Sequence, residues 1–262
     1  MPGAEDAESG VKLTVAVSCY NEADFIGATL DTVVRSVGKI GCTYEIIVVD
    51  DASRDDSVLK IQQYISSHPD MPVRLQANSI NRGLGNIFVD AAFLGRGKYY
   101  RLCVGKNAED GEALTNILKH IGEADIIIPY NDRPVIGKSG KRLALSGAYT
   151  SLVNFLSGYK IRYYNGLSVH LRQNVLRYHS SSFGFGFQAD LITRLLDEGA
   201  SYMQVPTYSI DRREGFSSAL RMRNVLSVVH TLLEIGLRRI RNTLYGRHTP
   251  PPVEVFEQRV PR

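Results

Sequence analysis

The chain has 262 residues and a mass of 29.1 kDa, a size that suits one large α/β domain with a sizeable core. Its hydrophobic content of 44% and charged content of 22% argue against disorder and against a multi-span membrane protein. The net charge of +4 is uneven, because residues 212–262 hold 10 Arg against 4 Glu, which is +6 and leaves −2 for the rest. This basic segment fits an anionic lipid, a phosphate-bearing ligand, nucleic acid or a solvated face.

The cysteines and the N-terminus favour a reducing compartment. Cys19, Cys42 and Cys103 are odd in number and widely spaced, so they imply neither a disulfide framework nor a zinc site. The first ten residues, MPGAEDAESG, are small, polar and acidic, without the apolar stretch of a secretory signal. We therefore expect a flexible tail at residues 1–10 and a cytoplasmic protein, with peripheral attachment to the inner face of the membrane as a further option.

Apolar runs alternate with helical patterns through residues 11–130. Runs of Val, Ile and Leu predict buried strands, and the candidates are LTVAVS, EIIVVD, VRLQ, YYRLCV and ADIIIP. Helical periodicity between these runs predicts an α/β fold, with a mostly parallel sheet covered by helices on both faces. Ligands of such sheets bind at the carboxyl ends of the strands, so we expect the functional residues there.

The second half of the chain has a different pattern of apolar and polar residues. Residues 131–216 combine a polar Arg/Lys/Gly stretch, the aromatic segment YKIRYYNG and further helix and strand patterns. A long amphipathic helical segment is predicted at residues 217–246, and a proline-rich tail, extended or disordered, at 247–262. We therefore expect a core domain over residues 11–216, followed by a helical segment and a tail.

Two adjacent carboxylates follow the second predicted strand. In EIIVVDDAS, the strand delivers Asp50 and Asp51 to the carboxyl edge of the sheet, where they can accept hydrogen bonds from a base N–H group or ribose hydroxyls. The alternative is that both residues only cap and turn the chain. A dinucleotide-binding domain would need a G-x-G-x-x-G turn after the first strand, but CYNEADF follows it, without a glycine before Gly27. This argues against an NAD-dependent oxidoreductase.

Four segments resemble glycosyltransferase family 2. SCYNEADFIGATLD, EIIVVDDASRDDS and NRGLGNIFVDAA match its first half in order and spacing, and VPTYSIDRREGFSS is similar to the late strand and D-R-x-x-G-x-S motif of polyprenol-phosphate sugar synthases. The resemblance covers residues 12–220 and implies a GT-A fold, with a nucleotide-sugar half at 11–130 and an acceptor half at 131–216. It implies an enzyme that transfers a sugar, with inversion, from a nucleotide-diphosphate sugar to a polyprenyl phosphate or another small acceptor.

The same resemblance implies roles for individual residues. Asp50 is expected to hold the nucleoside with Asp51 close by, and Arg212 is expected to reach a donor or acceptor phosphate, for which a guanidinium fork is suited. The further residues expected to contact substrate are Ser18, Tyr20, Glu22, Arg82, Gly83, Gly105, Asn107, Arg213 and Ser217. For Arg213 the alternative is a solvated loop arginine.

The metal-binding motif of the family is altered in this chain. Members normally end the fourth strand in a D-x-D-like motif that holds Mg²⁺ or Mn²⁺ against the donor diphosphate. Here Gly105, Lys106 and Asn107 occupy that position in CVGKNAED, and we expect Lys106 to act as a fixed positive charge, so that no cofactor is needed. The alternatives are a solvent-facing lysine, a protein that binds nucleotide sugars without turnover, and a shifted Mg²⁺ or Mn²⁺ site at Asp51, Glu109 and Asp110.

Asp190 is the candidate general base for transfer to a hydroxyl. It lies at the predicted start of a helix in GFGFQADLITRLL, where family members often carry acceptor-side residues, although a first-turn acid is the alternative. A phosphate acceptor would be ionised already and would need charge screening more than a base. The identity of the acceptor therefore decides whether Asp190 is required.

Residues 217–246 place apolar residues at helical spacing, flanked by several arginines. This pattern predicts a basic amphipathic helix that is too interrupted by polar residues to span a bilayer. Its expected partner is an anionic membrane surface, with packing on the catalytic domain or in a dimer as alternatives. Nucleic acid is not expected as a partner, because the basic residues alternate with an apolar face rather than an aromatic platform.

Overall fold

Strands and helices alternate along the residues that the computed structural model describes, which are 10–132, 139–178, 184, 186–208, 222–246 and 251–256. The strands are β1 (Leu13–Cys19), β2 (Tyr44–Asp50), β3 (Val73–Ala77), β4 (Tyr99–Val104), β5 (Ile126–Asn131), β6 (Val169–Leu171) and β7 (Tyr202–Thr207). The helices are α1 (Ile26–Ile40), α2 (Ser57–Ser67), α3 (Leu84–Leu94), α4 (Gly111–Leu118), α5 (Gly140–Ser157), α6 (Arg172–Arg177), α7 (Phe187–Asp197) and α8 (Met222–Leu244).

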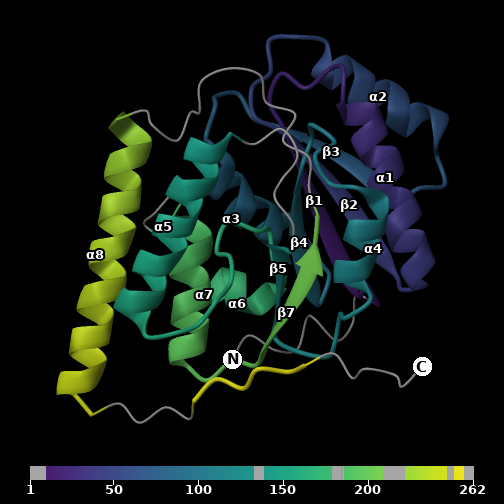
Figure 1. Cartoon of the computed structure of the whole chain (residues 1–262). Coiled ribbons are helices and arrows are strands. Elements are labelled where there is room, and N and C mark those ends of the chain that lie inside the picture. Colours follow the sequence, from purple (N-terminus) through teal and green to yellow (C-terminus); the bar gives the residue numbers. More distant parts are fainter. Residues whose placement is uncertain are drawn as a thin grey trace.

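The strands form one sheet in the order β3-β2-β1-β4-β6-β5-β7 (Figure 1). All neighbouring pairs are parallel except those of β6, which runs antiparallel to both β4 and β5. This confirms the expected α/β class and mostly parallel sheet. The sequence did not predict β6, because three residues are too few to show a periodicity.

Helices cover both faces of the sheet. The side chains of Val15 and Val17 join one buried core, which includes residues of α1 and α4, and Ala16 between them joins the other, which includes residues of α3 and α7. Helix α8 packs on α5 and α7 as an outer layer (Figure 1). All three cysteines are free thiols, as expected from their spacing.

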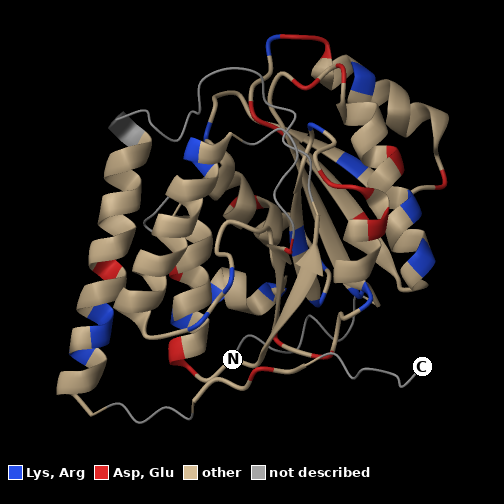
Figure 2. Ribbon diagram, in the orientation of Figure 1, with Lys and Arg blue, Asp and Glu red and all other residues tan. Residues whose placement is uncertain are grey.

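The carboxyl edge of the sheet carries three unusual backbone conformations. Among the described residues, the non-glycine residues with positive φ are Asn21 (54°), Ala52 (63°) and Asn107 (50°), and each follows the end of β1, β2 or β4. Such conformations are strained, and they persist where the surrounding contacts fix the chain. Figure 2 shows acidic residues gathered on the loops at this end, beside α1 and α2. These loops are therefore the first place to look for a site.

Part of the proline-rich tail forms a β-bridge with the edge strand β7. Tyr202 donates its N–H to the carbonyl of Val253 at 2.9 Å, and Val255 donates to the carbonyl of Tyr202 at 2.8 Å. The Gln204 amide also donates to the Glu254 carboxylate at 2.7 Å. Residues 251–256 therefore cover the outer side of β7, so of the two forms expected for the tail this part is extended and paired.

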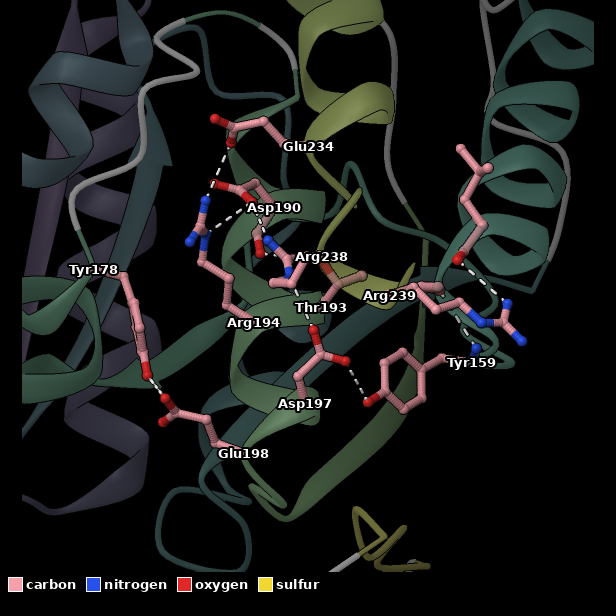
Figure 3. Close-up of polar contacts among 12 residues, drawn as sticks. Tyr159, Tyr178, Asp190, Thr193, Arg194, Asp197, Glu198, Glu234, Arg238 and Arg239 are labelled. Atoms are coloured by element: carbon pink, nitrogen blue, oxygen red, sulfur yellow. Dashed lines mark hydrogen bonds and ion pairs between the residues drawn. The ribbon is translucent and has the colours of Figure 1, made fainter. Parts of the chain in front are cut away.

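A buried ionic network joins α7 to α8 (Figure 3). Arg238 is 8% exposed and donates to Asp190 at 2.9 Å and to Asp197 at 2.8 Å. Arg194 donates to Asp190 at 2.9 Å and to Glu234 at 3.1 Å. The arginines of the amphipathic helix therefore do not all flank an outer surface as expected, because Arg238 points inward.

Removing Arg238 is expected to destabilise the protein strongly. In Arg238→Met, the buried carboxylate of Asp190 and the partly buried carboxylate of Asp197 lose a charged donor, and breaking a buried pair costs about 3 kcal/mol. Arg241→Met is the matched control, because Arg241 is exposed on the same helix and its loss should change stability by less than about 0.5 kcal/mol. Urea denaturation of both variants measures the difference, and equal losses would contradict the network's role.

Candidate functional site

Asp50 ends β2 with one carboxylate oxygen unused by the protein. The residue is 1% exposed, and its Oδ2 accepts a hydrogen bond from the N–H of Ser53 at 3.0 Å. Its Oδ1 is buried and has no hydrogen-bond partner among the described residues. Buried polar atoms are rarely left unsatisfied, so this oxygen is a candidate acceptor for a ligand N–H or hydroxyl.

Asp51 holds the loop that precedes α3. Its Oδ1 accepts from the N–H of Arg82 at 2.8 Å and from the Asn78 amide at 3.1 Å, and its Oδ2 accepts from the N–H of Gly83 at 2.8 Å. Gly83 has φ 80°, a conformation that favours glycine. Asp51 is 2% exposed, and its carboxylate holds the loop before α3 in place. The sequence predicted a direct contact with substrate for this residue.

The side chain of Arg82 is directed toward α3, the helix that follows it. It is 44% exposed and pairs with Asp90 of α3 at 2.6 Å. Its N–H group, with that of Gly83, is already taken by Asp51. A diphosphate contact from the Arg82 guanidinium, as expected from the sequence, would need this ion pair to open.

The loop after β1 is fastened to the loop after β2. The N–H of Asn21 donates to the Ser53 hydroxyl and the N–H of Glu22 to the Ser57 hydroxyl, both at 2.9 Å. Tyr20 is 45% exposed at the start of this loop. Burial raises the pKa of the Glu22 carboxyl, while the positive charge of Lys106 works against the rise. The ammonium group of Lys106 therefore acts electrostatically on Glu22.

The turn that carries Lys106 lies against β1 and α1. Gly105 donates its N–H to the carbonyl of Ser18 at 2.7 Å, and a Cβ on Gly105 would stand 2.7 Å from the same oxygen. The Thr29 hydroxyl donates to the Gly105 carbonyl at 2.7 Å and accepts from the Asn107 N–H at 2.9 Å. Because β1 lies between β2 and β4, these contacts bring Ser18, Glu22, Asp50 and Lys106 to one edge.

The carboxylates near this turn do not suit a divalent metal. Both Glu109 oxygens accept from Arg101, at 2.9 and 2.6 Å, and Asp110 caps α4 by accepting from the N–H of Glu112 at 2.8 Å. The Asp51 oxygens accept three N–H groups. Within the described ranges, no group of three or more His, Cys, Asp or Glu could hold a metal ion. The three residues of the alternative metal set, Asp51, Glu109 and Asp110, are therefore not gathered into one cluster in this structure.

Asp190 is poorly suited to the general-base role expected for it. The residue is fully buried, and its Oδ1 accepts from the two guanidinium groups of Arg194 and Arg238 (Figure 3). A general base needs to reach the acceptor hydroxyl, and this buried carboxylate is instead engaged by two guanidinium groups. The expected contacts at Arg212, Arg213 and Ser217 lie outside the described residues.

The structure adds Arg101 and Thr29 to the expected set. Arg101 occupies β4 and is fully buried, and Thr29 lies on α1. An arginine within the apolar run YYRLCV is the signal that would have identified Arg101, because a buried guanidinium requires a partner. Thr29 carries no comparable signal in the sequence.

Comparison with solved structures identifies the same fold. The glucosyl-3-phosphoglycerate synthase of Mycobacterium tuberculosis, in complex with Mn²⁺, UDP and phosphoglyceric acid, superposes with a TM-score of 0.67 at 17% identity, over 88% of this chain and 81% of that chain. The mannosyltransferase PcManGT of Pyrobaculum calidifontis, with GDP-mannose and Mn²⁺, gives 0.61 at 18% identity, over 92% and 67%. Both similarities support the GT-A fold expected from the sequence.

Curated relatives match a part of the chain. A dolichyl-phosphate β-glucosyltransferase of Dictyostelium discoideum is 28% identical over 131 residues, which is 47% of this chain and 40% of that protein. Its namesake in Drosophila melanogaster is 36% identical over 89 residues, 32% of this chain and 27% of that protein. The chain thus spans less than half the length of these relatives. Because the family model for glycosyl transferase family 2 matches residues 14–177, more than half of the chain, the protein belongs to glycosyltransferase family 2.

Proposed function

We propose that this protein transfers a sugar from a nucleotide-diphosphate sugar to a polyprenyl phosphate or another small acceptor. The observation that carries the proposal is the placement of the Lys106 turn, held by Ser18 of β1, on the sheet edge that also holds the unsatisfied oxygen of Asp50. The similarity to two dolichyl-phosphate β-glucosyltransferases supports a lipid-phosphate acceptor.

The nucleoside of the donor is proposed to bind at the ends of β1 and β2. The free oxygen of Asp50 would accept a hydrogen bond from the base or the ribose, and the exposed ring of Tyr20 would lie against the nucleoside. Glu22 supports a binding role for this loop, because its carboxylate is half-buried and its pKa is raised, mainly by burial. Burial of an ionised carboxylate destabilises the folded state, and such destabilising residues are common where a side chain binds a ligand.

Lys106 is proposed to act on the donor diphosphate. The acceptor oxygen attacks the anomeric carbon from the side opposite the diphosphate, so the configuration inverts and the nucleoside diphosphate leaves with the bonding electrons. A fixed ammonium group can stabilise that leaving charge, as electrostatic groups do in other transfer reactions. The described carboxylates at this position are engaged by protein donors, which favours a lysine-based site over a metal-based one.

The acceptor side is proposed to rest on a membrane surface. Helix α8 exposes a line of apolar residues at helical spacing, which are Leu226, Leu233, Leu237, Ile240 and Leu244. Phe155 is also exposed, on the neighbouring helix α5. Arg239 and Arg241 are exposed on α8. Within the described residues, no helix has both the length and the apolar character needed to cross a bilayer. Such a surface suits attachment at a lipid headgroup layer, where a lipid phosphate would be found.

A protein that binds nucleotide sugars without turnover is the second candidate. Two observations favour it: the expected base, Asp190, is buried between two guanidinium groups, and no carboxylate occupies the turn at Lys106. An acceptor that is already ionised would not need a base, so the first observation weighs less for a lipid phosphate.

Turnover is expected to continue in excess EDTA and to depend on Lys106. Lys106→Ala should lower the rate of sugar transfer about 100-fold, since removing one electrostatic donor from a transfer site commonly costs that much. Lys39→Ala, an exposed lysine in the last turn of α1, is the control and should leave the rate unchanged. A panel of UDP, GDP and dTDP sugars with dolichyl phosphate measures both. Activity lost in EDTA and restored by Mn²⁺ would contradict the proposal, and donor binding without turnover would favour the second candidate.

Neutralising Glu22 is expected to stabilise the protein at pH 7. The folded-state pKa of Glu22 is raised, so its carboxyl contributes most to stability below its unfolded-state pKa and loses that contribution as the pH rises through the folded-state pKa. Glu22→Gln should therefore raise the urea midpoint at pH 7 and have little effect near pH 3.5, while weakening nucleotide binding. Asp70→Asn, at an exposed loop, is the control. A lower midpoint at pH 7 would show that the carboxylate stabilises the fold.

An acidic residue on α8 is expected to abolish membrane attachment. Leu237 is 65% exposed, and Leu237→Glu places a negative charge within the apolar line, facing anionic lipid. Leu59→Glu is the control, because Leu59 is 52% exposed on α2, away from α8. Flotation with liposomes that contain phosphatidylserine should retain the control and lose the α8 variant. Absence of binding by the unmodified protein would rule out the attachment.

A further inference from the structure

We propose that the buried ion pair of Arg101 and Glu109 is a positioning device for Lys106. It holds the turn Gly105–Asn107 in its ligand-binding shape before the donor arrives. The inference rests on the proposed role of Lys106 and extends it to residues that do not touch the substrate.

The ion pair is bidentate and joins a fully buried arginine to a partly buried glutamate. Arg101 is fully buried, and its two terminal nitrogens donate to the two Glu109 oxygens at 2.9 and 2.6 Å. Its Nε donates to the Leu167 carbonyl at 3.2 Å, and Nη1 also contacts the Cys103 sulfur at 3.1 Å. A parallel pair of charged hydrogen bonds fixes orientation as well as distance. The guanidinium of Arg101 therefore has little freedom to move, and neither has Glu109.

The positive charge of Arg101 is balanced by the negative charge of Glu109. Burial raises the pKa of the Cys103 thiol to about 12, against the influence of Arg101, so the thiol remains neutral at physiological pH. One cation then faces one anion. An apolar pair could fill the same space with similar or greater stability, so a buried ion pair is better explained by the geometry that it imposes.

The ion pair joins the two ends of the segment that contains the turn Gly105–Asn107. Arg101 lies in β4, before Gly105, and Glu109 lies after Asn107, immediately before the residue that caps α4. The ends of the segment that carries Lys106 are thus joined by two hydrogen bonds, besides the strand on one side and the helix on the other.

Helix α1 fixes the other side of the same turn. Besides the two contacts of Thr29, the Thr32 hydroxyl donates to Oδ1 of Asn107 at 3.3 Å, and the Ser36 hydroxyl donates to the Gly111 carbonyl at 3.0 Å. Thr29, Thr32 and Ser36 share one face of α1, because they are three and four residues apart. These contacts allow Asn107 to keep its positive φ.

Lys106 therefore starts from a fixed backbone position. Ordering a loop at the moment of binding lowers affinity, and a loop that is ordered beforehand avoids this loss. The ion pair is thereby expected to contribute to the affinity for the diphosphate group and not to the affinity for the nucleoside.

The test compares binding of a nucleoside and its diphosphate by calorimetry in EDTA, using whichever of UDP, GDP and dTDP binds the unmodified protein most tightly. Glu109→Gln should weaken binding of the diphosphate about tenfold and leave the nucleoside unchanged. Glu45→Gln is the matched control: Glu45 is a buried acid that faces Arg74 and Arg96 at the opposite end of the strands. It should leave both affinities unchanged. Equal losses of nucleoside and diphosphate binding in Glu109→Gln would overturn the inference.

Combining the change with Lys106→Ala separates the inference from the proposed function. If the ion pair acts through Lys106, Glu109→Gln should cause no further loss of diphosphate affinity in the Lys106→Ala background. Independent, additive losses would overturn the inference and leave the role of Lys106 intact. If Lys106→Ala alone leaves diphosphate affinity unchanged, the proposed role of Lys106 fails and the inference with it. Thr29→Val, which removes the second anchor of the turn, should reproduce the selective loss and serves if Glu109→Gln does not fold.

Discussion

The buried carboxylate of Asp51 organises the carboxyl edge on which the proposed site depends. A charge at 2% exposure is costly unless donors surround it, and here two backbone N–H groups and one amide do so. The requirement for those donors brings the loop before α3 to the end of β2. The two neighbouring carboxylates therefore differ in role. Asp51 accepts hydrogen bonds from the protein at both oxygens, whereas Asp50 has one oxygen available for a ligand.

The positive charge of Lys106 is held on the other side of β1, on a turn that the protein fixes by several contacts. Lys106 lies on a turn whose neighbours are fixed by Ser18, Thr29 and the ion pair of Arg101 and Glu109. The edge thus offers a hydrogen-bond acceptor at β2 and a cation at β4, with Glu22 between them influenced by both burial and the cation. This order along the sheet corresponds to the order of nucleoside and diphosphate in a sugar nucleotide, which is the physical basis of the proposed function.

Much of this arrangement was predictable from the sequence. Runs of Val and Ile identified the parallel strands, and the motifs placed Glu22, Asp50 and Lys106 at their ends. By contrast, the environment of Asp190 depends on Arg238, 48 residues away, and the loop around Lys106 depends on hydroxyls of α1. Such contacts arise from packing between elements and leave no local pattern.

The pairing of residues 251–256 with β7 bears on how the chain folds during synthesis. The backbone groups of Tyr202 that meet Val253 and Val255 lack these partners until residues 251–256 have been synthesised. A nascent sheet therefore presents an open edge while α8 is being made, and such edges readily pair with other chains. Residues 251–256 thus protect this part of the β7 edge only after α8 has been made.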